Sequence, residues 1–297
     1  MQLIQQNLAT IDPIVLDVLS AQGLIAEVLR LDKVHPVISG NKWFKLQFYL
    51  QEAVQSNKKH ILTYGGPWSN HLVATAAACK ELGLQCTGVV RGESPKQFTP
   101  TLQEAASRGM KLEFISRAEY SIQKIKYSST QSDQFIIPEG GYGKLGVMGA
   151  ATIYSLLKGN SYTHILCAVG TGTMLAGLLS MAPKSCQCVG IPILNGAKAL
   201  EEAIQLQTAS DKENWKLETG FEWGGYAKHP PQLIEFMNSF FNKTNIPTDI
   251  VYTGKLFYAF TQLVEKNYFE KNSRILLIHS GGLQGNRSLS ASQLEFS

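Results

Sequence analysis

The sequence lacks the features that mark a nucleic-acid-binding or a disordered chain. Only 17% of its 297 residues are charged, the formal net charge is +4, and no basic run is denser than Lys58-Lys59. Nucleic-acid sites usually gather basic residues on one face, so we expect no nucleic-acid partner. Hydrophobic residues make up 44% of the chain, which is typical of a globular protein with a buried core.

Cysteine is also scarce, with five residues and no CxxC pair. An odd number scattered through apolar segments is typical of a reduced cytoplasmic protein, and a zinc site normally needs four well-spaced ligands. We therefore expect a cytoplasmic protein without a metal site. Cys186 and Cys188 have the alternate spacing of a strand, which predicts two packing residues on one sheet face.

No segment has the pattern of a secretory signal or a membrane span. The first six residues have neither a basic start nor a long apolar run. The stretch from Ile165 to Pro183 carries no charge, but Gly170-Thr171-Gly172 interrupts it. We expect a short strand, a polar turn and a short helix there, and no membrane partner.

What the chain does contain is a recurring order of β-rich run, glycine or serine turn, and helical pattern. The expected strands are His60–Tyr64, Gln85–Val90, His164–Val169, Gln187–Ile193 and Arg274–His279, and the expected helices are Asn70–Leu82, Thr99–Arg108, Met174–Met181 and Ala197–Gln207. This alternation predicts an α/β fold with open, twisted, mostly parallel sheets flanked by helices. We expect a smaller domain at 48–155, inserted into a larger one formed by 1–47 and 156–297.

Glycine turns follow several of the expected strands. They lie at Gly65-Gly66, Gly140-Gly141, Gly170-Thr171-Gly172 and Gly281-Gly282. Ligands of open parallel sheets bind at the carboxyl ends of the strands, so these turns predict a cleft between the two lobes.

Lys42 lies near the start of an expected helix, in Ser39-Gly40-Asn41-Lys42. Cations are disfavoured at helix N-termini, so the helix dipole does not explain this lysine. A solvated lysine is the ordinary alternative, whereas a desolvated lysine has the lowered pKa that Schiff-base chemistry needs. Lys45 is a competitor that spacing alone does not separate from Lys42.

Two further segments have the chemistry of anion sites. Trp68-Ser69-Asn70-His71 opens an expected helix, where amides and polar side chains suit a carboxylate, although Ser69 alone can serve as a helix cap. Gly170-Thr171-Gly172-Thr173 joins a strand to a helix and suits a phosphate. A dinucleotide site is the rival for this second segment, but Leu175 stands where the third glycine belongs and the next strand has no acidic residue. A glycine turn kept only for tight packing is the remaining alternative.

In this order, the segments resemble the family of 1-aminocyclopropane-1-carboxylate deaminases and D-cysteine desulfhydrases. The resemblance rests on Gly-Asn-Lys42, Gly-Gly-x-x-Ser-Asn-His71, Gly-Thr-Gly-Thr173, Tyr-Thr-Gly-Lys255 and His-Ser-Gly-Gly282, and it covers about 25–285. It implies the tryptophan-synthase-β-like (fold type II) fold, pyridoxal 5′-phosphate (PLP) as cofactor, and a homodimer.

The resemblance also implies roles for individual residues. Lys42 matches the lysine that binds PLP covalently, and Lys45 matches a second lysine near the phosphate. The other matches are Asn70 beside the ring hydroxyl, Ser69 at the substrate carboxylate with His71 and Trp68 bordering it, Gly170, Thr171, Gly172 and Thr173 around the phosphate, Tyr226 and Tyr252 facing the substrate, and Thr253 and Ser280 near the pyridine nitrogen.

Two departures from the family pattern bear on the reaction. Aminocyclopropane deaminases carry glutamate where this chain has Thr253, and a hydroxyl suits elimination of the desulfhydrase kind. This chain has Pro67-Trp68 where many members of the family have an aliphatic residue and glutamine, so the resemblance does not identify the substrate. We expect β-elimination from a D-cysteine-like amino acid, giving a keto acid and ammonia. The alternatives are an aminocyclopropane deaminase, a PLP-dependent racemase or dehydratase, a PLP-binding protein without turnover, and a nicotinamide-dependent reductase.

Overall fold

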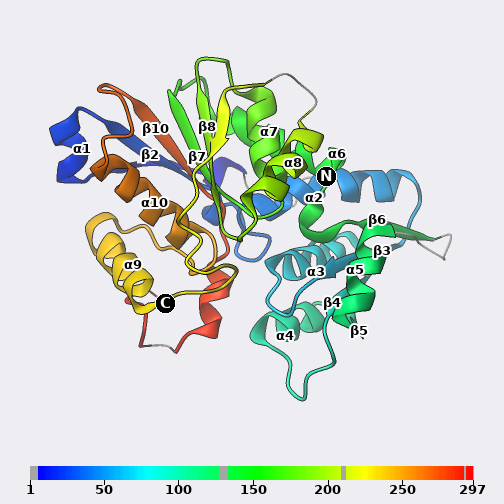
Figure 1. Cartoon of the computed structure of the whole chain (residues 1–297). Helices are drawn as coiled ribbons and strands as arrows, with labels where there is room; N and C mark the ends of the chain where they lie inside the picture. The colour runs from blue at the N-terminus through cyan, green and yellow to red at the C-terminus, as the bar shows by residue number, and fades with distance from the viewer. Residues whose placement is uncertain (1–5, 127–132, 209–211, 291, 297) are drawn as a thin grey trace.

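The strands of the computed structural model, which describes residues 6–126, 133–208, 212–290 and 292–296, form two sheets (Figure 1). The larger sheet has the strand order β1-β2-β10-β7-β8-β9. In that order the strands span Ile11–Ile14, Ile25–Arg30, Arg274–His279, His164–Val169, Gln187–Pro192 and Trp215–Leu217. Only β1 and β2 pair antiparallel among these described strands.

The smaller sheet is parallel throughout and has the order β5-β4-β3-β6. These strands span Met110–Ile115, Gln85–Arg91, His60–Gly65 and Gln134–Ile137. All of them come from one stretch of chain between β2 and β7. The predicted α/β class with two mostly parallel sheets is confirmed, whereas the domain limits 48–155 stay a prediction.

Ten α-helices are described, and most of them cover the two sheets. They are α1 (Asp17–Gln22), α2 (Asn41–Gln55), α3 (Asn70–Leu82), α4 (Pro100–Ser107), α5 (Arg117–Lys126), α6 (Lys144–Ala151), α7 (Thr173–Met181), α8 (Ala197–Gln207), α9 (Pro231–Thr244) and α10 (Thr253–Glu265). Both α3 and α8 begin and end at the predicted residues. Gly83 ends α3 in the left-handed conformation with φ 67°, as predicted.

Strand β7 shows how the core is divided into two layers. Ile165, Cys167 and Val169 pack in a cluster that continues through α7 and α2 to the smaller sheet. Leu166 and Ala168 point to the opposite face, where they pack with α9 and α10. Alternate side chains of a strand point to opposite faces, so β7, which is apolar from Ile165 to Val169, is covered on both faces.

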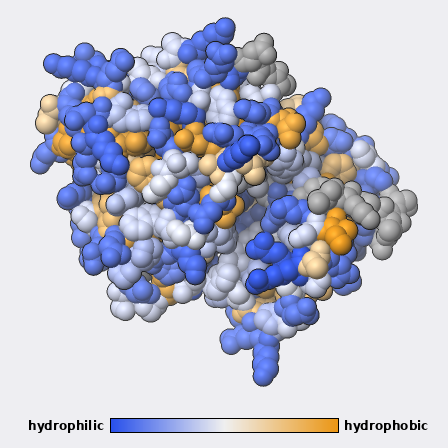
Figure 2. Space-filling model, in the orientation of Figure 1, coloured by the Kyte–Doolittle hydropathy of each residue, from blue (hydrophilic) through white to orange (hydrophobic). Residues whose placement is uncertain are grey.

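The cysteines lie inside these layers, and all five are buried and free. Cys186 and Cys188 pack in the same cluster, although β8 begins only at Gln187, between them. Hydrophilic residues cover most of the face seen in Figure 2, and hydrophobic residues are scattered over it in small groups. Within the described residues, no helix combines the length and the apolar composition that a bilayer crossing requires.

Candidate active site

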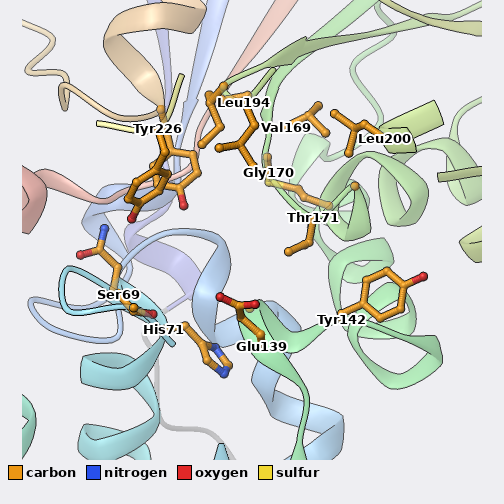
Figure 3. Close-up of a pocket in the computed structure, with 18 of the residues that line it drawn as sticks. Ser69, His71, Glu139, Tyr142, Val169, Gly170, Thr171, Leu194, Leu200 and Tyr226 are labelled. Atoms are coloured by element: carbon orange, nitrogen blue, oxygen red, sulfur yellow. The ribbon is translucent and has the colours of Figure 1, made fainter. Parts of the chain in front are cut away.

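A cavity of about 860 Å³ lies at the carboxyl ends of β3, β7 and β8, beside the start of α2 (Figure 3). This volume is in the range of small-molecule sites. The wall includes residues from α2, from the predicted glycine turns and from two tyrosines: Asn41, Lys42, Lys45, Gly66, Pro67, Trp68, Ser69, Asn70, His71, Glu139, Gly140, Gly170, Thr171, Gly172, Tyr226 and Tyr252. Three of the four predicted glycine turns thus contribute to the cavity, whereas Gly281 and Gly282 do not line it.

Lys42 reaches the cavity because two backbone segments approach each other closely. The Asn41 backbone nitrogen donates to the Ser280 carbonyl oxygen over 3.1 Å, at the start of α2. Gly40 has φ 68°, and a Cβ at this position would lie 1.8 Å from the same carbonyl oxygen. Only glycine satisfies both conditions. The sequence Ser39-Gly40-Asn41 thus brings Lys42 against the loop that follows β10.

The Lys42 amine lies in an environment that favours its neutral form. Its Nζ donates to Asn41 Oδ1 over 2.9 Å and lies 5.4 Å from the centroid of the Tyr252 ring. Burial lowers the pKa of Lys42 to about 8, although the negative charge of Asp249 opposes this shift. An amine with such a pKa is partly unprotonated near neutral pH and can act as a nucleophile.

Lys45 lies one helical turn further along α2 and contacts a different wall. Its Nζ donates to Thr171 Oγ1 over 3.4 Å. Burial lowers the pKa of Lys45 well below its ordinary value, and the charge of Lys42 adds to the effect. The structure thus separates the two lysines, with Lys42 beside Tyr252 and Lys45 beside the turn after β7.

The loop after β3 presents polar groups to the cavity. Ser69 directly precedes α3, but its side chain forms no capping hydrogen bond, so the suggested cap is not formed. Asn70 Oδ1 is buried and has no hydrogen-bond partner among the described residues. Both side chains line the cavity, and the loop is suited to a ligand that brings its own donors and a negative charge.

His71 lies beneath this loop, and its hydrogen bonds define its tautomer. The Thr63 hydroxyl has a single proton, which it donates to the Ile137 carbonyl oxygen over 2.8 Å. The 2.8 Å contact between Thr63 Oγ1 and His71 Nε2 therefore uses an N–H of the histidine. Burial lowers the pKa of His71 well below its ordinary value, and the charges of Lys45 and Lys42 lower it further. His71 is thus neutral, and its buried Nδ1 has no partner among the described residues.

The turn after β7 has the geometry of an anion site. Gly170, Thr171 and Gly172 line the cavity, and α7 begins at Thr173. The positive end of the helix dipole and the amine of Lys45 both favour an anion here. Thr173 itself is fully buried and lies behind the cavity wall, not on it.

Tyr226 and Tyr252 lie together on one side of the cavity. Their ring centroids are 6.5 Å apart and their planes form an angle of 81°. Figure 3 shows Tyr226 across the cavity from Ser69 and His71. Burial raises the pKa of Tyr226, and it raises the pKa of Tyr252 well above its ordinary value. Both phenols therefore keep their protons at neutral pH.

Thr253 and Ser280, which the resemblance assigns to the pyridine nitrogen, do not line the cavity. Thr253 is fully buried, and its hydroxyl donates to Asp249 Oδ2 over 2.7 Å. Asp249 also accepts hydrogen bonds from the backbone nitrogens of Val251, Tyr252 and Thr253. An acid thus lies directly behind the threonine that replaces the family's glutamate.

Sequence reasoning missed Asp249, Arg91 and Glu139. Arg91 ends β4 and Glu139 precedes the predicted Gly140-Gly141 turn, so the rule that strand ends line a cleft was a sufficient signal for both. Asp249 lies in a loop and had no such signal. The basic side chains of the wall, Lys42, Lys45, Arg91 and Lys124, outnumber its acid Glu139, which pairs with Lys124 over 2.5 Å. The cavity therefore favours anionic ligands.

No group of three or more histidine, cysteine or acidic side chains suited to a metal occurs in the part of the chain that the structure describes. The cavity instead combines a nucleophilic amine, an anion-binding helix start and a second polar loop. This arrangement suits a ligand with a reactive carbonyl and a phosphate, together with a small molecule that carries a carboxylate.

Comparisons with known proteins agree with this arrangement. Residues 16–281 match the family model described as "Pyridoxal-phosphate dependent enzyme". A Pyrococcus abyssi protein that carries the name of a 1-aminocyclopropane-1-carboxylate deaminase is 28% identical over 287 residues, which cover 89% of this chain and 86% of the relative. The mitochondrial bifunctional D-cysteine desulfhydrase/1-aminocyclopropane-1-carboxylate deaminase of Arabidopsis thaliana is 27% identical over 292 residues, which cover 84% and 70%.

Solved structures share the fold. The crystal structure of an ACC deaminase homologue is 24% identical and has a TM-score of 0.79, over 94% of this chain and 90% of that one. The O-acetylserine-dependent cystathionine β-synthase of Helicobacter pylori is 13% identical and has a TM-score of 0.71, over 98% and 99%.

Proposed function

The chain belongs to the family of pyridoxal-phosphate-dependent enzymes, and from this premise we propose that it eliminates the β-substituent of a small amino acid such as D-cysteine. The observation that carries the proposal is the position of Lys42. Its amine has a pKa lowered to about 8 and lies beside Tyr252, in a cavity that Ser69 and Asn70 also line.

The residues present fit PLP. Lys42 offers a nucleophile to the aldehyde. The amides of Gly170 and Thr171 and the amine of Lys45 offer donors to the phosphate, whose negative charge favours the protonated form of that amine. The buried, unpartnered Oδ1 of Asn70 is a polar atom that a bound ring and substrate would satisfy. When bound, PLP supplies an electron sink that stabilises negative charge at the α-carbon of the substrate.

The protein residues then bind the substrate and move its protons. Ser69 and the first amides of α3 hold its carboxylate, with Trp68 and His71 at the border. The Lys42 amine accepts the α-proton of the substrate, because its lowered pKa leaves it partly neutral. Thr253 and Ser280 support this side of the site from behind the wall.

Tyr226 and Tyr252 are the proposed acids. Both phenols are protonated at neutral pH, since burial raises the pKa of each. One of them donates a proton to the departing sulfur, so the leaving group is hydrogen sulfide. Water then releases ammonia, and the overall conversion is D-cysteine plus water to pyruvate, hydrogen sulfide and ammonia.

Opening of 1-aminocyclopropane-1-carboxylate is the second candidate. Its support is the naming of the relatives, of which the Arabidopsis protein combines both activities in its name. This reaction needs a proton delivered to carbon, which the same tyrosines or Lys42 can provide. Asp249 lies behind Thr253, the position at which aminocyclopropane deaminases carry a glutamate. This acid therefore favours the second candidate more than the sequence alone did. A racemase or dehydratase would use the same lysine and remains an outcome of the test.

The test begins with an absorbance spectrum of the purified protein, before and after borohydride. We expect a band near the visible edge and, after reduction, a cofactor-modified peptide that contains Lys42. The Lys42→Ala variant should lose both, whereas Lys80→Ala, at an exposed position of α3, should keep them. A colourless protein that PLP does not reconstitute would contradict the proposal.

Substrate assays then identify the reaction. Pyruvate and sulfide from D-cysteine support the elimination, 2-oxobutanoate from 1-aminocyclopropane-1-carboxylate supports the second candidate, and inversion of serine without keto acid indicates a racemase. Absence of turnover with all of these, in a protein that binds PLP on Lys42, would indicate a binding protein.

The proposal includes a cytoplasmic homodimer. Five buried, unpaired cysteines suit a reducing compartment. The homodimer is supported by the family resemblance and is tested by light scattering of the purified chain.

A further inference from the structure

Gln207, the last residue of α8, contacts the turn after β7 from the side away from the cavity. Its Nε2 donates to the carbonyl oxygens of Thr171 and Ala203, each over 3.0 Å. Its Oε1 accepts from the Thr173 hydroxyl over 2.8 Å and from the Gly143 backbone nitrogen over 3.4 Å. The carboxamide thus bonds to α8, to the turn after β7 and to the start of α6 at once.

These partners determine the orientation of the carboxamide. Two carbonyl oxygens face Nε2, and carbonyl oxygens only accept, so this atom must be the nitrogen. Reversing the amide would place its oxygen against both carbonyls and its nitrogen against the Gly143 N–H. Gln207 is thus held in one orientation, with its oxygen toward Thr173.

The fixed oxygen in turn directs the two threonine hydroxyls. The Thr173 hydroxyl donates its only proton to Gln207. In the 3.1 Å contact between the two threonines, the Thr171 hydroxyl is therefore the donor. Lys45 donates to that same Thr171 hydroxyl over 3.4 Å. The result is a directed chain from Lys45 through Thr171 and Thr173 to Gln207. Lys45 and Thr171 line the cavity, whereas Thr173 and Gln207 lie behind its wall.

We infer that Gln207 is a positioning residue for the cofactor phosphate: it holds the turn after β7 so that the turn's amides, and the Lys45 amine that donates to Thr171, face the phosphate. The inference rests on the phosphate placement proposed above. Gln207 does not line the cavity, so it acts through Thr171 and Thr173. Its bond to Gly143 also joins this turn to the 140–143 turn, which forms the neighbouring wall.

Two substitutions separate the parts of this role. Gln207→Leu keeps the size but removes all four hydrogen bonds of the carboxamide. Gln207→Glu is isosteric, but its carboxylate faces the carbonyl oxygens of Thr171 and Ala203 and adds negative charge behind the phosphate. Gln205→Glu is the matched control, since it adds the same charge at an exposed position of the same helix.

The measurement compares pyridoxine 5′-phosphate with pyridoxine by calorimetric titration of the apoprotein. Neither probe carries an aldehyde, so Lys42 cannot attach to either, and the ratio of their Kd values isolates the phosphate. We expect Gln207→Leu to weaken the binding of pyridoxine 5′-phosphate about tenfold, which corresponds to the loss of one or two hydrogen bonds. The binding of pyridoxine should stay nearly unchanged. Gln207→Glu should weaken binding of the phosphate ester further, and Gln205→Glu should bind both probes as the wild type does. The phosphorus resonance of the bound cofactor in the holoenzyme should move only in the two Gln207 variants.

Lys45→Met distinguishes failure of the inference from failure of the phosphate placement, because Lys45 is the side-chain donor that lines the cavity beside this turn. If this variant keeps full preference for the phosphate ester, the placement itself is wrong. If Lys45→Met loses the preference while both Gln207 variants keep it, the placement stands and the role of Gln207 is refuted. Equal weakening of both probes in the Gln207 variants would show general damage to the fold and would also overturn the inference.

Discussion

The Lys42 amine lies over the ring of Tyr252, 5.4 Å from its centroid, although the two residues are far apart in the sequence. The ring belongs to the residue directly before α10, whose backbone nitrogen donates to Asp249. The same loop thus places an aromatic face and a carboxylate near one lysine. Burial lowers the Lys42 pKa and Asp249 moderates the shift, so this loop controls when the amine is neutral.

The first prediction concerns the pH dependence of cofactor capture. Below its pKa of about 8 the Lys42 amine is protonated and cannot attack an aldehyde, so the capture rate should rise about tenfold per pH unit. Above about pH 8 the rate should level off. Stopped-flow absorbance of the apoprotein with PLP measures this profile. A rate that keeps rising to pH 10, as for an exposed lysine, would show that the amine is not desolvated.

Replacing Asp249 with Asn should shift that profile to lower pH. The carboxylate raises the Lys42 pKa, so its removal leaves burial unopposed and the midpoint falls. The variant also loses charge-assisted hydrogen bonds at the start of α10, which should lower the free energy of unfolding by about 1–3 kcal/mol. Asp17→Asn, which removes the same charge at an exposed position, should leave the Lys42 profile unchanged. An unchanged Lys42 profile in Asp249→Asn would show that the acid does not act on the lysine.

Gly40→Ala should lower the free energy of unfolding by more than the left-handed backbone conformation of Gly40 alone explains. Gly40 and Gly83 have φ values of 68° and 67°, but a Cβ at Gly83 meets nothing within 4 Å, whereas one at Gly40 would lie 1.8 Å from the Ser280 carbonyl oxygen. Gly83→Ala should cost about 1–2 kcal/mol, the left-handed penalty. Gly40→Ala should cost at least about 1–3 kcal/mol more, because the backbones must separate. Urea unfolding of both variants measures the difference, and equal costs would rule out the close contact.

The fourth prediction concerns the tautomer of His71. The wild-type ring should be neutral with its proton on Nε2 at pH 7, because Thr63 accepts that N–H and burial lowers the His71 pKa. Nitrogen-15 spectra of the imidazole report the tautomer directly. Thr63→Val should lose the Nε2–H···O bond and cost about 1–3 kcal/mol, since two buried polar groups lose their partner. Thr87→Val, which removes the analogous contact to His60, should leave the His71 signals unchanged. A charged or Nδ1-protonated His71 in the wild type would refute the assignment.

Much of the fold follows from local pattern. The alternation of apolar strands and helical segments is enough to predict β7, β10, α3 and α8: β7 and β10 are short apolar runs, and α3 has a marked end at Gly83. The order of the strands in the sheets does not follow from local pattern. The antiparallel pairing of β1 with β2 and the place of β10 between β2 and β7 depend on contacts between distant segments, which periodicity does not encode.

For the site, local sequence was enough to predict which residue types lie on which turns, including Lys42, the Ser69-Asn70 loop and the Gly170–Gly172 turn. The difference between the two lysines depends on the folded chain, because it comes from burial and from contact with Tyr252 and Thr171. Tertiary structure also placed Thr253 behind the wall, against Asp249, and Gln207 behind the turn after β7. These relationships depend on hydrogen bonds between residues far apart in the chain, and such bonds leave no local signal in the sequence.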